Sequence, residues 1–237
     1  MSTSDQKVAI ITGASQGIGA GLVDGYRAIG YAVIATSRGI APSQDPEVLT
    51  VQGNIADPAT AERVADAALD RFGRIDALVN NAGVFLSKPF HEYTQADYDA
   101  ITGVNVSGFF RISQLAVEQM LRQGTGHVVQ ITTSLVDHAN SAVPSVLASL
   151  TKGGLQSATK ALAIEYADRG IRSNAVSLGA IRTPMNPPEF HDALGAMHPM
   201  GRVGEVQEVV DAVLYLEHAL FVTGEILHVD GGQSAGH

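Results

Sequence analysis

The sequence of 237 residues contains no cysteine and no tryptophan, and only 16% of its residues are charged. Without cysteine, disulfide bonds and thiolate metal sites are excluded. Long hydrophobic runs are also missing, because Gly, Asn or a charged residue interrupts each apolar stretch before it could span a bilayer. Residues 1–5 lack the basic and apolar parts of a signal peptide. We therefore expect a cytoplasmic protein that does not enter the membrane.

Positive charge is scarce as well, with 15 Lys and Arg against 24 Asp and Glu and a formal net charge of −9. This balance argues against a general nucleic-acid surface. The eight histidines are His91, His127, His138, His191, His198, His218, His228 and His237. They are scattered without the spacing of metal ligands, so we expect no metal site.

The chain is rich in glycine and in apolar residues, with 25 glycines and 45% hydrophobic residues. A chain of this length can bury a large core, and it shows neither repeats nor a low-complexity linker. These features indicate one α/β domain over residues 1–237.

The most informative glycines are Gly13, Gly17 and Gly19, which follow an apolar run of strand length. Gly13 allows a sharp reversal, Gly17 removes a side chain where a pyrophosphate would approach, and Gly19 lets the next helix lie close to the strand. The free N–H groups of that helix would then face an anion. The spacing Gly-x3-Gly-x-Gly differs from the usual dinucleotide fingerprint, so a strand–helix turn without a ligand remains the alternative.

Short apolar runs alternate with helical patterns along the rest of the chain. The predicted strands are 8–12, 31–37, 48–54, 75–80, 127–132, 172–177 and 225–229. The predicted helices are 16–29, 57–72, 95–122 with breaks near Gly103 and Gly108, 149–169 and 205–219. This alternation predicts one parallel, doubly wound sheet with helices on both faces, whose ligands bind beyond the carboxyl ends of the strands.

Six motifs, in this order, resemble the short-chain dehydrogenase/reductase family over essentially the whole chain. They are Thr12–Gly19, Asn80–Gly83, Val104–Gly108, Thr151–Leu155, Ile171–Ser177, and Thr223-Gly-Glu followed by Val229-Asp-Gly-Gly232. The resemblance implies a single Rossmann-like domain with a seven-stranded parallel sheet. It also implies a nicotinamide dinucleotide, a small carbonyl or alcohol substrate, and a homo-oligomer, either a tetramer or a dimer.

The end of the second predicted strand bears on the choice of dinucleotide. A carboxylate there would accept the adenine ribose hydroxyls and repel a 2′-phosphate. This chain has Ser37 and Arg38 instead, and Arg38 offers a charge-assisted grip on a phosphate with Ser37 and Ser15 as nearby donors. The sequence therefore favours NADP over NAD, while a solvated Arg38 without a ligand is the alternative.

The resemblance places further groups along the cofactor. Asn54 and Ile55 would hold the adenine, and Thr183 would bond the nicotinamide carboxamide. The complete predicted cofactor-binding set is Gly13, Ser15, Gln16, Gly17, Ile18, Gly19, Ser37, Arg38, Asn54, Ile55, Asn81, Ala82, Gly83, Lys152, Ile181 and Thr183. One departure lies nearby, because Leu178-Gly179 stands where the family has Pro-Gly.

Reduction of a carbonyl needs a proton donor beside the oxygen, and the family uses Asn, Ser, Tyr and Lys for this. By resemblance, Asn105 supports a water-linked proton path and Lys152 binds the nicotinamide ribose and lowers the pKa of the tyrosine. Ser134 is the predicted serine, with Thr133 as the close alternative. We predict Asn105, Ser134 and Lys152 as the catalytic residues.

The family's tyrosine is missing from this chain. It should lie four residues before Lys152, one helical turn back on the same face, and that position is Ala148. Residues 132–165 contain no tyrosine, and Tyr166 lies roughly 21 Å beyond Lys152 along a helix. Loss of the acid costs on the order of 10²–10⁴ in rate if nothing replaces it.

Three hypotheses follow. The first, which the retained residues favour, is an NADP-leaning oxidoreductase with a relocated proton donor. The second is a catalytically weak or inactive NADP-binding sensor or assembly protein, and the third is an enzyme of another class, such as a dehalogenase or lyase. The candidate donors are His138, Ser149, Asp137 and a water bound to Lys152.

Residues 184–202 resemble the substrate lid of the family. Met185, Phe190, Met197 and Met200 could form an adaptable apolar wall over a substrate. His191 or His198 could swing in as an acid, and packing of the lid or a subunit contact is the alternative role for the whole segment.

Overall fold

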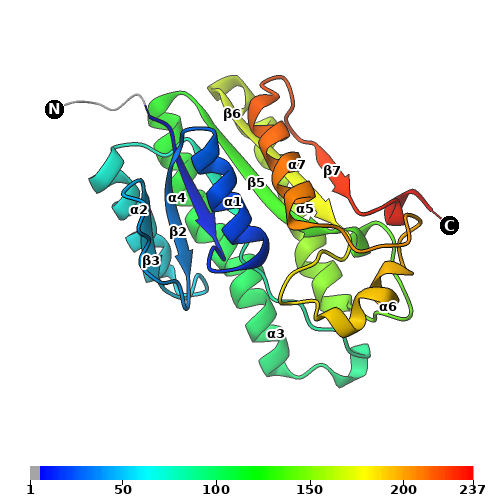
Figure 1. Cartoon of the computed structure of the whole chain (residues 1–237). Helices are drawn as coiled ribbons and strands as arrows, with labels where there is room; N and C mark the ends of the chain where they lie inside the picture. Colours follow the sequence, from blue (N-terminus) through cyan, green and yellow to red (C-terminus); the bar gives the residue numbers. More distant parts are fainter. Residues whose placement is uncertain (1–5, 237) are drawn as a thin grey trace.

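Seven parallel strands form one twisted sheet with helices on both faces in the computed structural model, which describes residues 6–236 (Figure 1). The strand order is β3-β2-β1-β4-β5-β6-β7, so the predicted fold class is confirmed. The residues behind the signal-peptide prediction, 1–5, lie outside the described part, as does His237.

The strands are short and built from apolar, largely β-branched residues. Their bounds are Val8–Thr12 (β1), Ala32–Ser37 (β2), Val48–Gln52 (β3), Ala77–Asn80 (β4), Gly126–Thr133 (β5), Ile171–Leu178 (β6) and Ile226–Val229 (β7). The central strands are buried along their length because helices cover both sides of a parallel sheet. The chain changes direction across the sheet between β1 and β4, which is the point where doubly wound folds bind ligands.

The helices divide between the two faces of the sheet. Their bounds are Gly17–Ala28 (α1), Pro58–Phe72 (α2), Gln95–Thr102 (α3), Phe109–Gln123 (α4), Val146–Tyr166 (α5), His191–Gly195 (α6) and Val206–His218 (α7). Helices α1 and α7 pack on one face, and α2 and α4 pack on the other. Successive residues of β1 alternate between these two cores, as the pleat of a strand requires, with Ile11 in the first and Ile10 in the second.

The predicted helix 95–122 is interrupted between α3 and α4 by a π-helical turn at Gly103–Gly108. Gly108 permits this turn to pack closely, because a β-carbon there would lie 2.9 Å from a side-chain carbon of Ile55. The turn rotates Asn105 inward, where 1% of its surface is exposed. The other long helix, predicted at 149–169, begins three residues earlier, at Val146.

A buried polar cluster lies near the opposite end of the sheet and joins α1, α7, β5 and β6. The carboxylate of Glu217 on α7 accepts hydrogen bonds from Tyr31 (2.7 Å) and Tyr26 (3.2 Å). His127 of β5 lies 2.8 Å from the same carboxylate through Nδ1. Arg172 of β6 donates to the last carbonyls of α7, including that of Leu216 at 2.7 Å.

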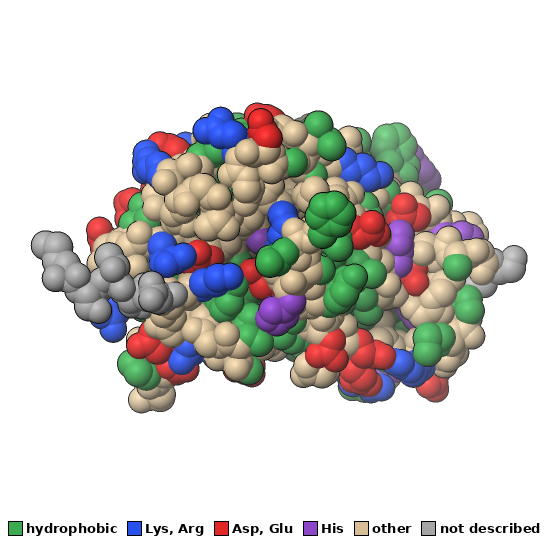
Figure 2. All heavy atoms as spheres, turned by 90° about the horizontal axis from the view of Figure 1, so that it is seen from above, with side chains coloured by type: hydrophobic (Ala, Val, Ile, Leu, Met, Phe, Trp, Pro, Cys, Tyr) green, Lys and Arg blue, Asp and Glu red, His purple; other side chains and the backbone are tan. Residues whose placement is uncertain are grey.

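No helix over 6–236 is long and apolar enough to cross a membrane. In the same part of the chain, no three His, Asp or Glu side chains gather as metal ligands would. On the face that Figure 2 shows, Lys and Arg side chains are interspersed with Asp and Glu.

Candidate active site

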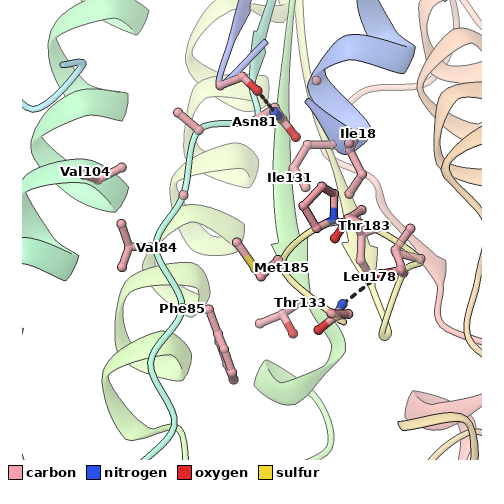
Figure 3. A pocket seen from close by; sticks show the side chains of 18 of the residues that line it. Ile18, Asn81, Val84, Phe85, Val104, Ile131, Thr133, Leu178, Thr183 and Met185 are labelled. Carbon is pink, nitrogen blue, oxygen red and sulfur yellow. Dashed lines mark hydrogen bonds between the residues drawn. The ribbon is translucent and has the colours of Figure 1, made fainter. Parts of the chain in front are cut away.

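One cavity of about 670 Å³ lies where the carboxyl ends of β1, β2, β4, β5 and β6 converge. Its size falls within the roughly 300–1,000 Å³ typical of small-molecule sites. Every residue of the predicted cofactor-binding set lines it, together with Ser134 and Ala148. Residues far apart in the chain, such as Val84 and Thr183, lie on opposite sides of it in Figure 3.

The glycine-rich turn supplies one wall of this cavity. Gly13 and Gly17 adopt φ angles of +67° and +54°, which side chains rarely tolerate. A β-carbon on Gly19 would lie 2.2 Å from the carbonyl oxygen of Gly13, so only glycine allows this approach of helix to strand. Gln16, at the N-cap of α1, makes no side-chain capping bond. The first N–H groups of α1 are therefore available to an anion.

Asn81 supports the turn rather than reaching into the cavity. Its side-chain amide donates to the carbonyl oxygens of Thr12 (2.9 Å) and Gly13 (3.2 Å), which ties the end of β4 to the end of β1. The hydroxyl of Thr12 in turn accepts from the backbone N–H of Ala82 at 3.0 Å. The segment Asn81–Gly83 therefore lines the middle of the cavity in a fixed position.

The far end of the cavity, beyond β2 and β3, carries the residues predicted for the adenine half. The Ser37 hydroxyl is buried and has no hydrogen-bond partner among the described residues. Arg38 is exposed at the rim beside it. Asn54 accepts a bond from the backbone of Ala56 at 3.2 Å, which shapes the turn after β3. A buried hydroxyl without a partner among the described residues, next to an exposed guanidinium, suits an anionic group.

The side chains of Lys152 and Asn105 both lie close to Gly83. A β-carbon at Gly83 would come within 3.1 Å of the Lys152 ammonium and 3.5 Å of the Asn105 amide oxygen. Asn105 accepts from the backbone N–H of Val84 at 2.8 Å, and Lys152 donates to the carbonyl of Ile131 at 2.6 Å. Desolvation by the surrounding protein lowers the pKa of Lys152 to about 8. Asn105 itself is behind the wall rather than on it.

The two candidate hydroxyls at the end of β5 point in different directions. The Ser134 side chain is fully buried, and its hydroxyl lies 3.1 Å from the carbonyl of Leu178 and 2.8 Å from the amide oxygen of Gln233. Thr133, the preceding residue, extends into the cavity near Phe85 and Met185 (Figure 3). Thr133 thus presents its side chain to a ligand, whereas Ser134 bonds to protein groups.

Ala148 lies on the first turns of α5, with 1% of its surface exposed and its methyl group on the cavity wall. No Tyr, His, Asp or Glu lines the described cavity, so Lys152 and Arg38 are its titratable groups. The other proposed donors are engaged elsewhere. Ser149 donates to the carbonyl of Leu135 at 3.2 Å. Asp137 and His138 are also absent from the cavity wall.

Two of the four apolar residues predicted to form the lid wall line the cavity. Met185 and Met197 line the cavity, joined by Leu194. Phe190 and Met200 do not line it and are 55% and 64% exposed.

Neither lid histidine faces the cavity. His191 lies 2.8 Å from Arg182, and burial lowers the pKa of His198, whose Nε2 accepts from the backbone of Ala180 at 3.0 Å.

Gln233 is a cavity residue that the sequence interpretation missed. It follows Gly231 and Gly232, which both adopt positive φ, and it is 2% exposed. The signal available in the sequence was its position directly after Gly231 and Gly232, the glycine pair that closes the last of the family motifs.

The fold and the cavity define a doubly wound α/β protein with a ligand site at its switch point, and comparisons with known proteins agree. The family described as enoyl-(acyl carrier protein) reductase matches residues 13–234. The 3-oxoacyl-[acyl-carrier-protein] reductase FabG of Thermotoga maritima is 33% identical over 244 residues, covering 95% of this chain and 97% of its own.

Solved structures give the same result. ElxO with bound NADP superposes with a TM-score of 0.90 at 28% identity, covering 98% of this chain and all of that one. The 3-ketoacyl-(acyl-carrier-protein) reductase of Brucella melitensis, complexed with NADH, gives 0.88 at 30% identity with 96% and 98% covered. The chain belongs to the short-chain dehydrogenase/reductase family.

Proposed function

We propose that this protein is an NADP(H)-dependent oxidoreductase that transfers hydride between the nicotinamide and a small carbonyl or alcohol substrate. One observation carries the proposal. The N-terminus of α1, which has no side-chain cap, and Lys152 line the same cavity. The nicotinamide would supply or accept the hydride. The reductase activity in the name of the Thermotoga relative supports the reaction class.

The preference for NADP is supported by the end of β2. The buried Ser37 hydroxyl lacks a partner among the described residues, and Arg38 stands at the rim without a carboxylate beside it on the cavity wall. A 2′-phosphate would satisfy both groups with charge-assisted bonds. The bound NADP of the ElxO structure agrees with this choice, while the NADH of the Brucella structure makes NAD the alternative to test.

The proton for the carbonyl oxygen is proposed to come from Lys152 through a water held in the space that Ala148 leaves. Ala148 lies one turn before Lys152 on α5, so both face the same part of the cavity. With a pKa of about 8, Lys152 is protonated at neutral pH yet releases its proton readily. Arg38 cannot serve, because a guanidinium stays charged.

A hydroxyl beside the carbonyl would polarise it as charge develops. We assign this role to Thr133, since it extends into the cavity while the Ser134 hydroxyl bonds to Leu178 and Gln233. Asn105 is a positioning residue, because its amide fixes the backbone of Val84 and holds the π-helical turn next to Lys152.

The reacting end of the cavity favours an apolar substrate. Phe85, Val143, Met185, Leu194 and Met197 line it, and the flexible methionines can adapt to different shapes. Lys152 is its one cationic side chain among the described residues, and it is committed to the reaction. We therefore propose an uncharged ketone or aldehyde, or the matching alcohol.

A homo-oligomer, a tetramer or a dimer, remains part of the proposal. Helices α4 and α5 expose apolar side chains to solvent, with Phe110 62%, Leu150 60% and Ile164 82% exposed. Patches of this kind mark subunit contacts in soluble proteins. Sedimentation of the purified protein at micromolar concentration would report a multiple of 24.7 kDa.

The direct test is to follow NADPH oxidation over a panel of aldehydes, ketones and sugars, with the Lys152→Ala variant as control. We expect slow turnover of apolar ketones by the wild type and a loss on the order of a hundredfold in the variant. Micromolar NADPH binding without turnover of any compound would overturn the enzyme proposal and favour the sensor or assembly role.

A further inference from the structure

His198 is a buried histidine near the end of the lid segment 184–202. Only 4% of its surface is exposed, and the preceding residue, Met197, lines the cavity. The His198 side chain lies against two glycines. A β-carbon added at Gly179 would come within 2.8 Å of the ring carbon Cε1, and one added at Gly231 within 3.1 Å of Cβ. The lid therefore ends on a ring that is packed directly behind the cavity wall at Gly179.

A hydrogen bond connects this ring to the backbone of the cavity wall. The Nε2 atom of His198 accepts from the N–H group of Ala180 at 3.0 Å. Ala180 lines the cavity between Gly179 and Ile181, which also line it. The carbonyl oxygen of Ala180 accepts from the N–H group of Gly204 at 2.9 Å, so both backbone polar groups of Ala180 are paired. His198 thus fastens the end of the lid to one stretch of the wall.

The bond to Ala180 decides which ring nitrogen of His198 carries the proton. A ring nitrogen that accepts a hydrogen bond is unprotonated, so the neutral ring holds its proton on Nδ1. The Nδ1 atom is buried and has no hydrogen-bond partner among the described residues. A second proton, on Nε2, would point at the N–H group of Ala180, which is itself a donor. The closed arrangement therefore fits the neutral ring and conflicts with the protonated one.

The two segments that pack against the ring, 178–180 and 230–232, contain one titratable side chain, that of Asp230. The charge of Asp230 favours the protonated ring, but burial disfavours it more strongly, so the pKa of His198 lies below its ordinary 6.5. The Asp230 carboxylate accepts from the backbone N–H groups of Gly232 (2.9 Å) and Ser234 (2.8 Å). These bonds hold the carboxylate in the turn after β7, where it does not accept from the buried Nδ1 of His198.

We infer that His198 is a positioning residue that holds the lid closed as a neutral imidazole and releases it when protonated. In the closed form Leu194 and Met197 lie on the cavity wall, and the N–H group of Ala180 is paired. In the released form the end of the lid moves away and the wall at Ala180 and Ile181 loses its support. The inference rests on the proposed function only for the reaction that takes place in the cavity, since release of the lid is measured without turnover.

The direction of the pH effect follows from the difference between the two forms. A released His198 faces water and has its ordinary pKa of 6.5, whereas the closed form has a lower pKa. Because the released form binds the proton more readily, the closed lid has its full stability above pH 6.5 and loses stability as the pH falls. Between pH 6.5 and the lower pKa of the closed form, each pH unit shifts the equilibrium toward release by up to about tenfold.

The test is hydrogen exchange of the Ala180 amide in the full-length protein, corrected for the intrinsic exchange rate at each pH. In the wild type we expect the protection of this amide to fall by up to about tenfold from pH 7.5 to pH 5.5. His198→Leu removes the acceptor and should lower the protection at both pH values. His198→Gln, whose amide oxygen accepts the same bond without titrating, should recover most of that loss and remove the dependence on pH.

His191→Gln is the matched control, because His191 is the other lid histidine and its ring lies 2.8 Å from Arg182 on an exposed part of the lid. It should keep the wild-type response to pH. Nitrogen NMR at pH 7.5 should show His198 with its proton on Nδ1. Protection of Ala180 that is independent of pH in the wild type, an equal fall in His198→Gln, or a proton on Nε2 would overturn the role of His198 while leaving carbonyl reduction intact.

The same measurements keep this inference separate from the proposed function. If the wild type reduces no carbonyl compound, the proposed function fails. Hydrogen exchange and the protonation state of the ring then still decide the role of His198, because neither depends on turnover.

Discussion

Two side chains decide how the reacting end of the cavity handles a proton. Ala148 contributes a methyl group where the family has a phenol, and Lys152 is the titratable group that remains there among the described residues. The family tyrosine works because its hydroxyl lies beside the carbonyl oxygen. In this protein the Lys152 ammonium, acting through a water in the space over Ala148, would supply the proton instead, and the Thr133 hydroxyl would polarise the carbonyl.

Restoring the phenol should raise the rate. In Ala148→Tyr we expect reduction of a generic ketone to increase by about tenfold or more, because a positioned acid is worth 10²–10⁴. The Ala148→Phe variant, with the same ring and no hydroxyl, should be slower than the wild type since it fills the space without supplying a proton. Equal rates in Ala148→Tyr and Ala148→Phe would contradict the assignment.

The pH dependence of the wild type should follow Lys152. Because desolvation lowers its pKa to about 8, the group is protonated below pH 8 and loses the proton above it. We expect kcat/KM for carbonyl reduction to be level near pH 7 and to fall tenfold per pH unit above about 8. Ala148→Tyr should shift or flatten this fall, and a wild-type profile that is flat to pH 10 would exclude Lys152 as the donor.

Arg38 should decide between the two dinucleotides. Removing a charged hydrogen-bond donor costs about 1.5–3 kcal/mol, so Arg38→Ala should weaken NADPH binding roughly 10- to 100-fold. NADH affinity should stay within about twofold, and Arg111→Ala, which removes a surface arginine paired with Glu62, should change neither. Fluorescence titration gives both constants, and a variant that keeps its preference for NADPH would refute the NADP assignment.

At the scale of elements, features that depend on local backbone geometry could be predicted from the sequence. Features that depend on contacts between residues far apart in the chain could not. The glycine turn was predictable because Gly13 and Gly17 occupy φ angles that demand glycine. The choice between Thr133 and Ser134 was not, since one residue along a strand reverses the direction of a side chain. The presence of Gln233 at the cavity was not predictable either, because its contact with Ser134 joins residues far apart in the chain, which no local pattern encodes.

Adding a single β-carbon at Gly19 should disrupt the turn from β1 to α1. Gly19→Ala would place its methyl 2.2 Å from the Gly13 carbonyl, so α1 must move away from the strand and both stability and dinucleotide binding should drop. Gly154→Ala is the control, because nothing lies within 4 Å of its added carbon on α5 and it should be neutral or slightly stabilising. Thermal unfolding and NADPH titration measure both effects. A Gly19→Ala protein with wild-type affinity would show that the close approach is not required.

At the scale of the whole molecule, the cluster around Glu217 binds α7 to α1 and the sheet. Burial acts to raise the pKa of Glu217, but hydrogen bonds from His127 and Tyr31 and the charge of Arg172 outweigh it and lower the pKa. Burial lowers the pKa of His127, although the neighbouring Glu217 carboxylate acts to raise it.

Removing that charge should destabilise the fold without touching the cavity. Glu217→Gln leaves the half-buried Arg172 without its counter-charge, and breaking a buried ionic group costs about 3–5 kcal/mol. Because the folded pKa of Glu217 lies below its ordinary 4.5, its contribution is present above pH 4.5 and is lost as pH falls toward the folded value. Urea unfolding at pH 7 and pH 3 should therefore show a larger gap between wild type and variant at pH 7, and an equal gap would be inconsistent with this role.

Hydride transfer in a cavity without the family's tyrosine is the central claim, and isotope transfer tests it most directly. NADPH carrying deuterium on the transferred C4 position is incubated with an apolar ketone, and the alcohol is analysed by mass spectrometry. We predict one deuterium on the carbinol carbon with the wild type and more product with Ala148→Tyr. Lys152→Ala should give almost none. Absence of deuterated alcohol with the wild type, while Ala148→Tyr forms it, would contradict the claim that Lys152 and Ala148 constitute a working active site.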